Sequence, residues 1–280
     1  MLIRARDFNL RYTIESGQPL TFFADYSFSG KIAHLKYPMY EGFIEVEAEQ
    51  KGRDCTLTAA SENYSKAELS REVKERLGLN DKINEIYKSI STDAFIKDAI
   101  KRFYGMRITK NELWQTTLSF IVSQFNSIKR IRKIMLCFIE RFGKGYFPRW
   151  EKFAGANASE IACGAGFRAS YIKEVAERYD PDVFSNYSML SYNEAKSKLM
   201  EYKGIGDKVA DCILLMGYKK LEAFPIDTWV KRVLVNVYKP ERESTKELHQ
   251  FASSRWGNFA GYAEHYLYWY GREIAFRSFI

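Results

Sequence analysis

A lysine that follows two closely spaced glycines is the residue of this chain best suited to do chemistry. Lys208 comes two positions after Gly206, in the segment Tyr202–Ile213, where the apolar pattern passes from one helix to the next. Glycines such as Gly204 and Gly206 suit a tight turn and let backbone N–H groups approach a phosphate closely. Asp207 fits the first turn of a helix, whereas a cation there opposes the helix dipole. Because a locally broken rule often marks a functional site, we interpret Lys208 as a reactive amine.

A carboxylate that could act with this lysine comes later, in the segment Phe224–Trp229 (FPIDTW). Asp227 stands where its side chain can cap the following helix. A helix of about ten residues advances roughly 15 Å, and the loop after it can span that distance back. Asp227 and Lys208 can therefore lie at the same end of two neighbouring helices. Two plainer interpretations stay open, a simple cap at Asp227 and a solvated phosphate contact at Lys208.

The pair suits a displacement at a sugar carbon. A lysine amine is nucleophilic only when it is neutral, and we expect partial burial and the positive helix end to lower the pKa of Lys208. A nearby carboxylate could accept its proton or stabilise positive charge that develops on the substrate. The chemistry indicated is attack on a carbon with oxocarbenium character, followed by a Schiff base.

Composition indicates a folded protein with a basic surface. Of 280 residues, 46% are hydrophobic and 28% charged, which is typical of soluble domains. The net charge of +8 favours a polyanionic partner without requiring one. The 16% aromatic share offers platforms for base stacking as well as core. No stretch approaches about 18 uninterrupted apolar residues, so we expect no membrane association.

The cysteines give no sign of a metal site. Cys55, Cys137, Cys163 and Cys212 lie far apart and no pair has CxxC spacing, so neither zinc nor an iron–sulfur cluster is indicated. Their scatter is typical of a reducing compartment, and the chain does not begin with the apolar run of a signal peptide. We expect an intracellular protein, in the cytoplasm or nucleoid or in a nucleus, with no metal ligands.

The elements that must position these residues change type along the chain. Alternate apolar residues over 8–14 and 44–48 predict strands, and Ser16–Pro19 and Ser29–Gly30 are turn signals typical of hairpins. From about residue 65 the pattern becomes helical. Helical stripes occur at 113–124 and 128–142, and further helices are expected near 169–179, 190–202, 207–217, 228–238, 244–255 and 260–276.

These patterns predict an α+β fold. An N-terminal antiparallel β-sheet domain, residues 1–82, is expected to pack on a larger all-helical domain, residues 83–280, that contains a helix-hairpin-helix motif. No linker separates the two parts, so we expect them to be in contact.

Five segments in order along the chain carry a family resemblance. They are Ser16–Gln18, SFIVSQFNSIKRI at 119–131, GAGFRASYI at 164–172, LMEYKGIGDKVADCILLMG at 199–217 with the following AFPIDTW, and WGNFAGYAEHYLY at 256–268. Together they resemble the 8-oxoguanine DNA glycosylase/AP lyases of the helix-hairpin-helix DNA glycosylase superfamily, of the type with an N-terminal sheet domain. The resemblance covers most of the chain.

The resemblance implies a role for each matching residue. Lys208 would be the nucleophile, Asp227 the essential carboxylate, and the Gly17 carbonyl the acceptor for the N7–H of 8-oxoguanine. Glu264 would contact the pairing edge of the base. The other pocket walls would be Cys212, Pro225, Trp229 and Tyr268. Residues matching DNA contacts are Phe125, Asn126, Arg130, Phe167, Arg168, Gly204 and Gly206. No cofactor is implied beyond a structural monovalent cation on the carbonyls of Met200, Tyr202 and Ile205.

Four of these positions depart from the family's more familiar members. Phe125 stands for an asparagine, Trp229 for a histidine, Tyr268 for a phenylalanine and Glu264 for a glutamine. Phe125 can still intercalate as an apolar wedge, but it loses hydrogen bonds to the opposite strand.

The implied activity is excision of 8-oxoguanine from duplex DNA by base flipping, attack of Lys208 on C1′, a Schiff base and β-elimination. The expected partner is double-stranded DNA containing oxidised guanine, and a monomer is the default. Two alternatives stay open. A monofunctional alkylbase glycosylase needs no lysine at position 208. A non-catalytic helix-hairpin-helix module leaves Asp227, Gly17 and the Glu264/Tyr268 pair unexplained.

Overall fold

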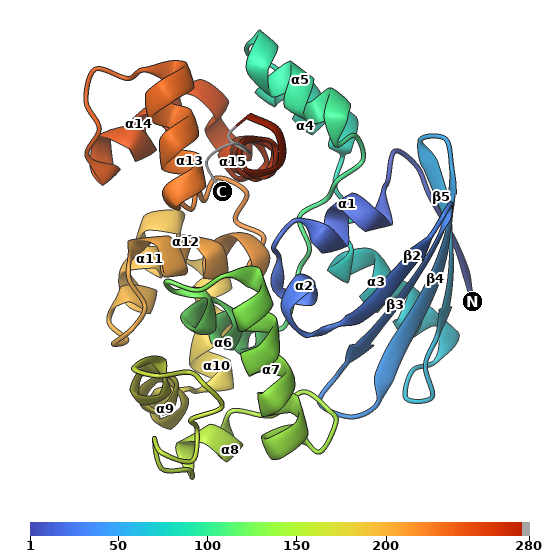
Figure 1. Ribbon diagram of the computed structural model, residues 1–280, viewed down its shortest axis with the longest axis vertical. Helices are drawn as coiled ribbons and strands as arrows, with labels where there is room; N and C mark the ends of the chain where they lie inside the picture. The colour runs from blue at the N-terminus through green and yellow to red at the C-terminus, as the bar shows by residue number, and fades with distance from the viewer. Residues whose placement is uncertain (276–280) are drawn as a thin grey trace.

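The computed structural model describes residues 1–275 and begins with a five-stranded antiparallel sheet in the order β1-β5-β4-β3-β2 (Figure 1). In β3, β4 and β5 every second residue is buried, so one face of the sheet packs against the rest of the protein. Ser29 pairs with Ile32 across the turn at Gly30, as the turn signal predicts. The strands are β1 (Leu2–Ala5), β2 (Asp25–Ser29), β3 (Ile32–Pro38), β4 (Phe43–Lys51) and β5 (Asp54–Ala60).

The strand expected over residues 8–14 is wrong, because this segment forms helix α1 (Leu10–Glu15). Asn9 caps the helix, and its side chain accepts a hydrogen bond from the Tyr12 N–H at 3.0 Å. The buried residues are Leu10, Thr13 and Ile14, which is helical spacing. Tyr12 is only half-buried. Counting its ring as a core residue produced the alternating pattern from which the strand was predicted. The Ser16–Pro19 turn consequently joins α1 to α2 (Pro19–Phe23) instead of two strands.

The rest of the described chain is helical, which confirms the predicted α+β class. The helices are α3 (Lys66–Arg76), α4 (Ile83–Ile90), α5 (Ala94–Arg102), α6 (Leu113–Ser123), α7 (Ile128–Gly143), α8 (Glu151–Ala154), α9 (Arg168–Arg178), α10 (Pro181–Asn186), α11 (Tyr192–Met200), α12 (Asp207–Met216), α13 (Thr228–Val233), α14 (Thr245–Trp256) and α15 (Ala260–Tyr270). Short 3-10 turns lie at Tyr187–Met189 and Gly257–Phe259, and π-helical turns extend α13 to Tyr238 and α15 to Ala275. Residue 276, the expected end of the last helix, lies outside the described residues.

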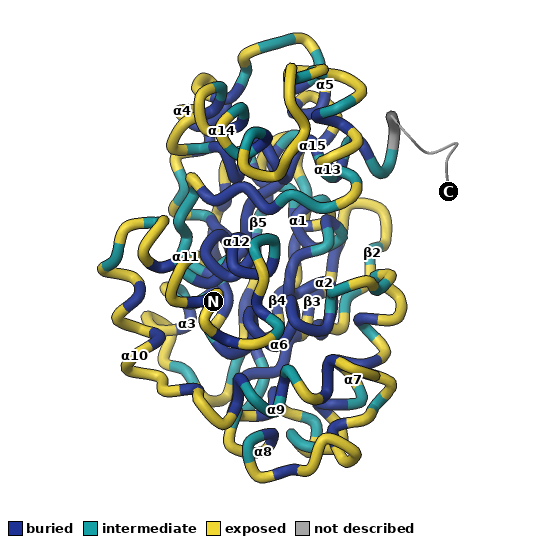
Figure 2. The backbone as a smooth tube through the Cα atoms, turned by 90° about the vertical axis from the view of Figure 1, so that its left-hand side faces the viewer, coloured by how far each residue is buried: buried dark blue, intermediate teal, exposed yellow. Residues whose placement is uncertain are grey.

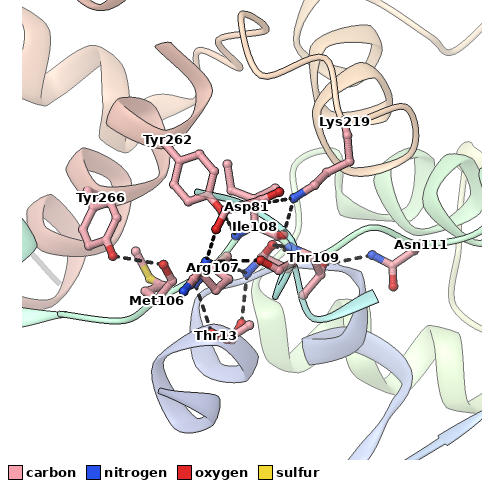
Figure 3. A network of polar contacts seen from close by, with 12 residues as sticks. Thr13, Asp81, Met106, Arg107, Ile108, Thr109, Asn111, Lys219, Tyr262 and Tyr266 are labelled. Atoms are coloured by element: carbon pink, nitrogen blue, oxygen red, sulfur yellow. Dashed lines mark hydrogen bonds and ion pairs between the residues drawn. The ribbon is translucent and has the colours of Figure 1, made fainter. Parts of the chain in front are cut away.

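Polar contacts join the sheet part to the helical part, as Figure 3 shows. Asp81, between α3 and α4, accepts hydrogen bonds from the Lys219 ammonium at 2.7 Å and from the Tyr262 hydroxyl of α15. The guanidinium of Arg107 donates to the backbone carbonyl of Asp7, just after β1, at 3.0 Å. The buried apolar residues of both parts also form one continuous core. The expected packing of the two parts is therefore confirmed.

A disulfide joins Cys137 in α7 to Cys163, which precedes α9. The sequence did not indicate this pairing, because residues 26 positions apart meet only in the folded chain. Cys55 and Cys212 are free and buried. Over residues 1–275, no helix combines the length and apolar character needed to cross a membrane.

Candidate active site

Helix α12 carries Lys208 in its first turn and runs through the interior of the molecule. Its residues from Val209 to Met216 are all buried, and its backbone lies in the dark, central part of Figure 2. It packs against α6 and α11. A helix that is buried all round is held on every side, so α12 is a rigid support for the lysine at its start.

The two glycines of the hairpin before α12 have different reasons to be glycine. Gly204 has φ +91°, and a Cβ there would lie 2.5 Å from the Tyr171 side chain. Gly206, the N-cap of α12, has an ordinary φ of −91° and open space around it. Only Gly204 therefore has a backbone angle that requires glycine in this tight turn. Open space at Gly206 leaves room for another backbone to approach closely.

A polar cluster fixes the start of α12 to its neighbours. The Lys196 ammonium of α11 lies 3.2 Å from Asp207 and 2.9 Å from the fully buried Asp211. His249 of α14 lies 2.9 Å from Asp207, and the Tyr192 hydroxyl donates to Asp211 at 2.6 Å. The hydrogen bond from His249 and the charge of Lys196 lower the pKa of Asp207 to about 2, against the opposing effect of its burial. The carboxylates already share an ammonium, and the cluster holds the helix that carries Lys208.

One cavity of about 330 Å³ lies beside Lys208. It brings together residues from five separate segments of the chain, and it contains every position predicted for catalysis or for the base pocket. The predicted residues that line it are Gly17, Asn126, Lys208, Cys212, Pro225, Asp227, Trp229, Glu264 and Tyr268. A cavity of this size can bury a small ring system.

Asp227 caps α13, as the sequence predicts, because its carboxylate accepts a hydrogen bond from the Val230 N–H at 2.8 Å. Burial raises the pKa of Asp227, while the backbone N–H of Val230 and the charge of Lys208 act in the opposite direction. Lys208 lies 3.4 Å from the Ser123 hydroxyl and 5.2 Å from the centre of the Phe120 ring. The two predicted catalytic side chains line one cavity from the starts of two helices, α12 and α13.

The lowered pKa that the sequence suggested for Lys208 is wrong for this structure. Burial disfavours the ammonium, but Cys212, Asp227 and Glu264 outweigh it and raise the pKa of Lys208. The sequence argument failed because it counted desolvation and the helix end and left out the acidic neighbours that the fold supplies. In the free protein, Lys208 is charged.

The walls of the cavity include two further acidic groups whose pKa values burial raises. Burial raises the pKa of the Cys212 thiol to about 12, so Cys212 is a small apolar surface. Burial and the nearby Asp227 raise the pKa of Glu264 well above its usual range. An ionised carboxylate only accepts hydrogen bonds, whereas the acid form that burial makes more favourable also offers one donor.

Tyr268 lies across Gly17 at the side of the cavity. A Cβ on Gly17, whose φ is +78°, would lie 2.9 Å from the Tyr268 hydroxyl oxygen. That oxygen accepts a hydrogen bond from Arg272 at 3.2 Å. Arg272 and His265 line the cavity but were not predicted. Glu264, Tyr268 and Arg272 follow at intervals of four along one helix face, and this spacing could have indicated Arg272.

The predicted DNA contacts outside the hairpin lie where α7 and α9 begin, on the loops before these helices and in their first turns. Phe125 is 93% exposed with φ +50°, and Phe167 is 51% exposed. Arg168 is buried, and its Nε donates to the backbone carbonyl of Gln124 at 2.7 Å. Arg130 donates to the Gly164 carbonyl at 3.3 Å. In this structure the aromatic rings are available for stacking, whereas both guanidinium groups contact the protein's own backbone.

Most of the hairpin carbonyls expected to bind a cation accept no hydrogen bond from described residues outside regular helices. The Tyr202 carbonyl accepts the Ile205 N–H at 3.0 Å. Those of Met200 and Ile205 accept no hydrogen bond from the described residues outside regular helices. Carbonyl oxygens with free lone pairs suit a monovalent cation, so these residues fit the ion that the resemblance implies.

Family models match both parts of the chain. A model of the HhH-GPD superfamily of base excision DNA repair proteins matches residues 118–258, and a model of the N-terminal domain of 8-oxoguanine DNA glycosylase matches residues 1–117. The solved structure of MBOgg1 in complex with a low-affinity DNA ligand is 32% identical, with a TM-score of 0.83, and the alignment covers 98% of this chain and 96% of that one.

Two further proteins are similar to this chain. The 8-oxoguanine glycosylase/lyase of Clostridium acetobutylicum, in complex with dsDNA containing cytosine opposite 8-oxoG, is 28% identical with a TM-score of 0.83 over 98% of both chains. The N-glycosylase/DNA lyase of Saccharomyces cerevisiae is 28% identical over 211 residues, which are 59% of this chain and 56% of that protein. The matches span 36% to 56% of the length of the curated N-glycosylase/DNA lyase relatives. The chain belongs to the HhH-GPD superfamily of base excision DNA repair proteins, with an 8-oxoguanine DNA glycosylase N-terminal domain at its start.

Proposed function

We propose that this protein is a bifunctional DNA glycosylase/AP lyase that excises 8-oxoguanine from duplex DNA. One observation carries the proposal: Lys208 and Asp227 line the same cavity as Gly17 and Glu264. The first pair suits attack on a sugar, and the second pair suits recognition of a base. The name of the Clostridium acetobutylicum relative supports the substrate.

The target nucleotide must first leave the duplex. Unstacking a base costs a few kcal/mol, and an apolar wedge inserted between base steps can offset part of that cost. Phe125 is almost fully exposed and takes this role in the proposal. Phe167 stacks beside the unpaired partner base. The phosphate backbone approaches Gly206, where a Cβ would meet no atom within 4 Å.

The cavity then recognises the extruded base. The Gly17 carbonyl accepts a hydrogen bond from N7–H, a donor that 8-oxoguanine has and guanine lacks. Glu264 contacts the pairing edge, accepting N1–H with one oxygen. The Tyr268 ring and the Cys212 thiol pack against the two faces of the purine.

Cleavage follows at C1′. Lys208 first loses a proton, since only the neutral amine attacks, and Asp227 is an acceptor on the wall of the same cavity. A bond forms between the Lys208 nitrogen and C1′ as the bond from C1′ to N9 breaks, and the base leaves with the electron pair and takes up a proton. The Asp227 carboxylate stabilises the oxocarbenium character of C1′.

The lyase step starts from the imine. Opening of the sugar ring gives a Schiff base between C1′ and Lys208, and loss of a proton from C2′ expels the 3′ phosphate by β-elimination. Water then hydrolyses the imine and restores the lysine. The strand is nicked on the 3′ side of the lesion.

Several properties belong to the same proposal. A monovalent cation on the carbonyls of Met200, Tyr202 and Ile205 would hold the hairpin against a DNA phosphate. We place the boundary between the sheet domain and the helical domain at residue 82, and we propose a monomer that acts inside the cell, where its substrate is.

Borohydride trapping tests the proposal directly. The wild type should form a covalent adduct with duplex that contains 8-oxoguanine, and Lys208→Gln should form none while it still binds the duplex. An adduct in Lys208→Gln would assign the nucleophile to another amine. Release of 3-methyladenine without any wild-type adduct would replace the proposal with a monofunctional alkylbase glycosylase.

A further inference from the structure

The turn that carries Gly17 is held by two buried polar side chains. Ser16 and Gln18 are both fully buried. The Gln18 amide donates to the carbonyls of Thr13 at 3.0 Å and Arg107 at 2.8 Å, and its oxygen accepts the Thr109 N–H at 2.7 Å. Thr13, Arg107 and Thr109 also belong to the polar network of Figure 3. The C-terminal side of the turn is therefore tied to the segment that joins the two parts of the protein.

His265 holds the other side of the turn from helix α15. Its Nε2 lies 2.9 Å from the Ser16 hydroxyl oxygen, and the imidazole is buried. The Ser16 hydroxyl donates its only proton to the Thr13 carbonyl at 3.0 Å. With that proton on the Thr13 carbonyl, the Ser16 oxygen accepts from the Gln18 amide at 3.1 Å and from His265, which places the imidazole proton on Nε2.

The same imidazole lies against the aromatic wall of the cavity. The rings of His265 and Tyr268 are nearly parallel, at 19°, with centres 6.3 Å apart. Burial, with a smaller effect from Lys219, lowers the pKa of His265 to about 3. His265 is thus a neutral group that contacts both Ser16 and Tyr268 and lines the cavity itself.

We propose that His265 is a positioning residue for base recognition. By donating from Nε2 to Ser16 and backing the Tyr268 ring, it fixes the distance between the Gly17 carbonyl and the aromatic wall. The two sides of the slot that receives the purine are then set by one side chain. This inference rests on the proposed function, since it concerns how that activity selects its base.

Two activities of one enzyme separate positioning from folding. Excision of 8-oxoguanine needs the Gly17 carbonyl, whereas cleavage of a preformed abasic site involves no base. His265→Leu should lower the single-turnover rate of 8-oxoguanine excision about tenfold, the usual effect of one lost hydrogen bond. Its cleavage of abasic duplex should stay within about twofold of the wild type.

Two further variants make the test specific. Ser16→Ala removes the same hydrogen bond from the other side without opening a cavity in α15, and should reproduce the selective loss. His265→Gln keeps an N–H donor and should recover most of the excision rate. In the double variant, His265→Leu with Ser16→Ala, the two losses should add less than fully, because the Ser16–His265 hydrogen bond is lost in both, while Ser16→Ala also removes the contacts of its hydroxyl with Thr13 and Gln18.

Equal losses of both activities in His265→Leu and Ser16→Ala would overturn the inference, since they would indicate a purely structural role. Unchanged excision in both variants would also overturn it. If the wild type cleaves abasic sites but releases no 8-oxoguanine, the proposed substrate is wrong. Failure of the positioning role alone requires an active wild type, so the two failures are distinguishable.

Discussion

At the scale of single residues, the site combines a charged lysine with acids that burial makes weak. Lys208 needs to be neutral to attack, yet Cys212, Asp227 and Glu264 keep its pKa high in the free protein. Burial raises the pKa of Asp227 at the same time, so the two side chains compete for protons. An extruded nucleotide that displaces water from the cavity strengthens these interactions, and substrate entry can thus set the protonation of the pair.

Asp227→Asn should separate the chemistry of this carboxylate from its capping role. Asparagine caps helices about as well as aspartate, so the melting temperature should change little. Loss of the negative charge should lower the single-turnover excision rate by at least about 100-fold, as expected when electrostatic stabilisation of a transition state is removed. Asp227→Ser, another good cap, is the matched control. Excision within tenfold of the wild type in both variants would contradict the proposed role.

His265 predicts a pH dependence of stability. Its folded pKa of about 3 lies below the ordinary value of 6.5, so the unfolded chain binds this proton first. The contribution of the neutral imidazole is complete above pH 6.5 and is lost as the pH falls toward 3, at roughly 1.4 kcal/mol per unit. The groups facing it are Ser16, Tyr268 and, more distantly, Lys219.

Urea unfolding at pH 7, 6 and 5 would measure this slope. Asp227 and Glu264 have raised pKa values and change the stability in the opposite direction. The informative quantity is therefore the difference between the wild type and His265→Leu, in which the acids are unchanged. The difference should shrink as the pH falls from 7 to 5. A constant difference would contradict the neutral, buried state of the imidazole.

At the scale of elements, the conformation of the hairpin before α12 depends on the lack of a side chain at Gly204. Gly204→Ala places a methyl group 2.5 Å from Tyr171 and forces an L residue to a φ of +91°. The hairpin also loses its fit beside α6, where Gln124 donates to the Gly204 carbonyl at 3.0 Å. The variant should lose roughly 1–3 kcal/mol of unfolding free energy, measured by urea denaturation.

Gly206→Ala is the matched control for this prediction. Its φ is ordinary and its surroundings are open, so the free protein should keep its stability. If DNA approaches this position, the methyl group should weaken binding to duplex while the melting temperature stays unchanged. Equal destabilisation by the two alanines would contradict the steric distinction between them.

Secondary structure was largely predictable from the sequence where one period was clear. The stripes at 113–124 and 128–142 became α6 and α7, and the alternation over 44–48 lies in β4. The strand predicted over 8–14 was wrong because its apolar residues fit both periods. The structure shows that Asn9 caps a helix there. Caps and periods are local, so they are readable wherever they agree.

At the scale of the whole molecule, a buried ion pair holds the two parts together. Lys219 and Asp81 are 17% and 13% exposed and lie 2.7 Å apart. Asp81→Asn leaves the Lys219 ammonium without its counter-ion, which burial already disfavours. We expect a loss of up to about 3 kcal/mol in unfolding free energy, measured by urea denaturation.

The double variant Asp81→Asn with Lys219→Met provides the control. Removing both charges removes the uncompensated ammonium, so stability should recover most of what Asp81→Asn loses. If the double variant is as unstable as the single one, the hydrogen bond from Tyr262 to Asp81, and not the ion pair, is the important contact.

The sequence by itself determined the family, the fold class and the residues that come together at the site. Lys208, Asp227, Gly17 and Glu264 were identifiable because their segments have characteristic residues in a fixed order, and all four line one cavity. Their individual roles stay predictions, of which Lys208→Gln and Asp227→Asn test two.

Only the tertiary structure decided the protonation and the support of that site. The raised pKa values of Lys208 and Glu264 and the Cys137–Cys163 disulfide depend on groups that are distant in the chain. His265 gained its place beside Ser16 in the same way, across 249 residues. Residue type and spacing are written in the sequence, whereas burial and electrostatic surroundings exist only once the chain has folded.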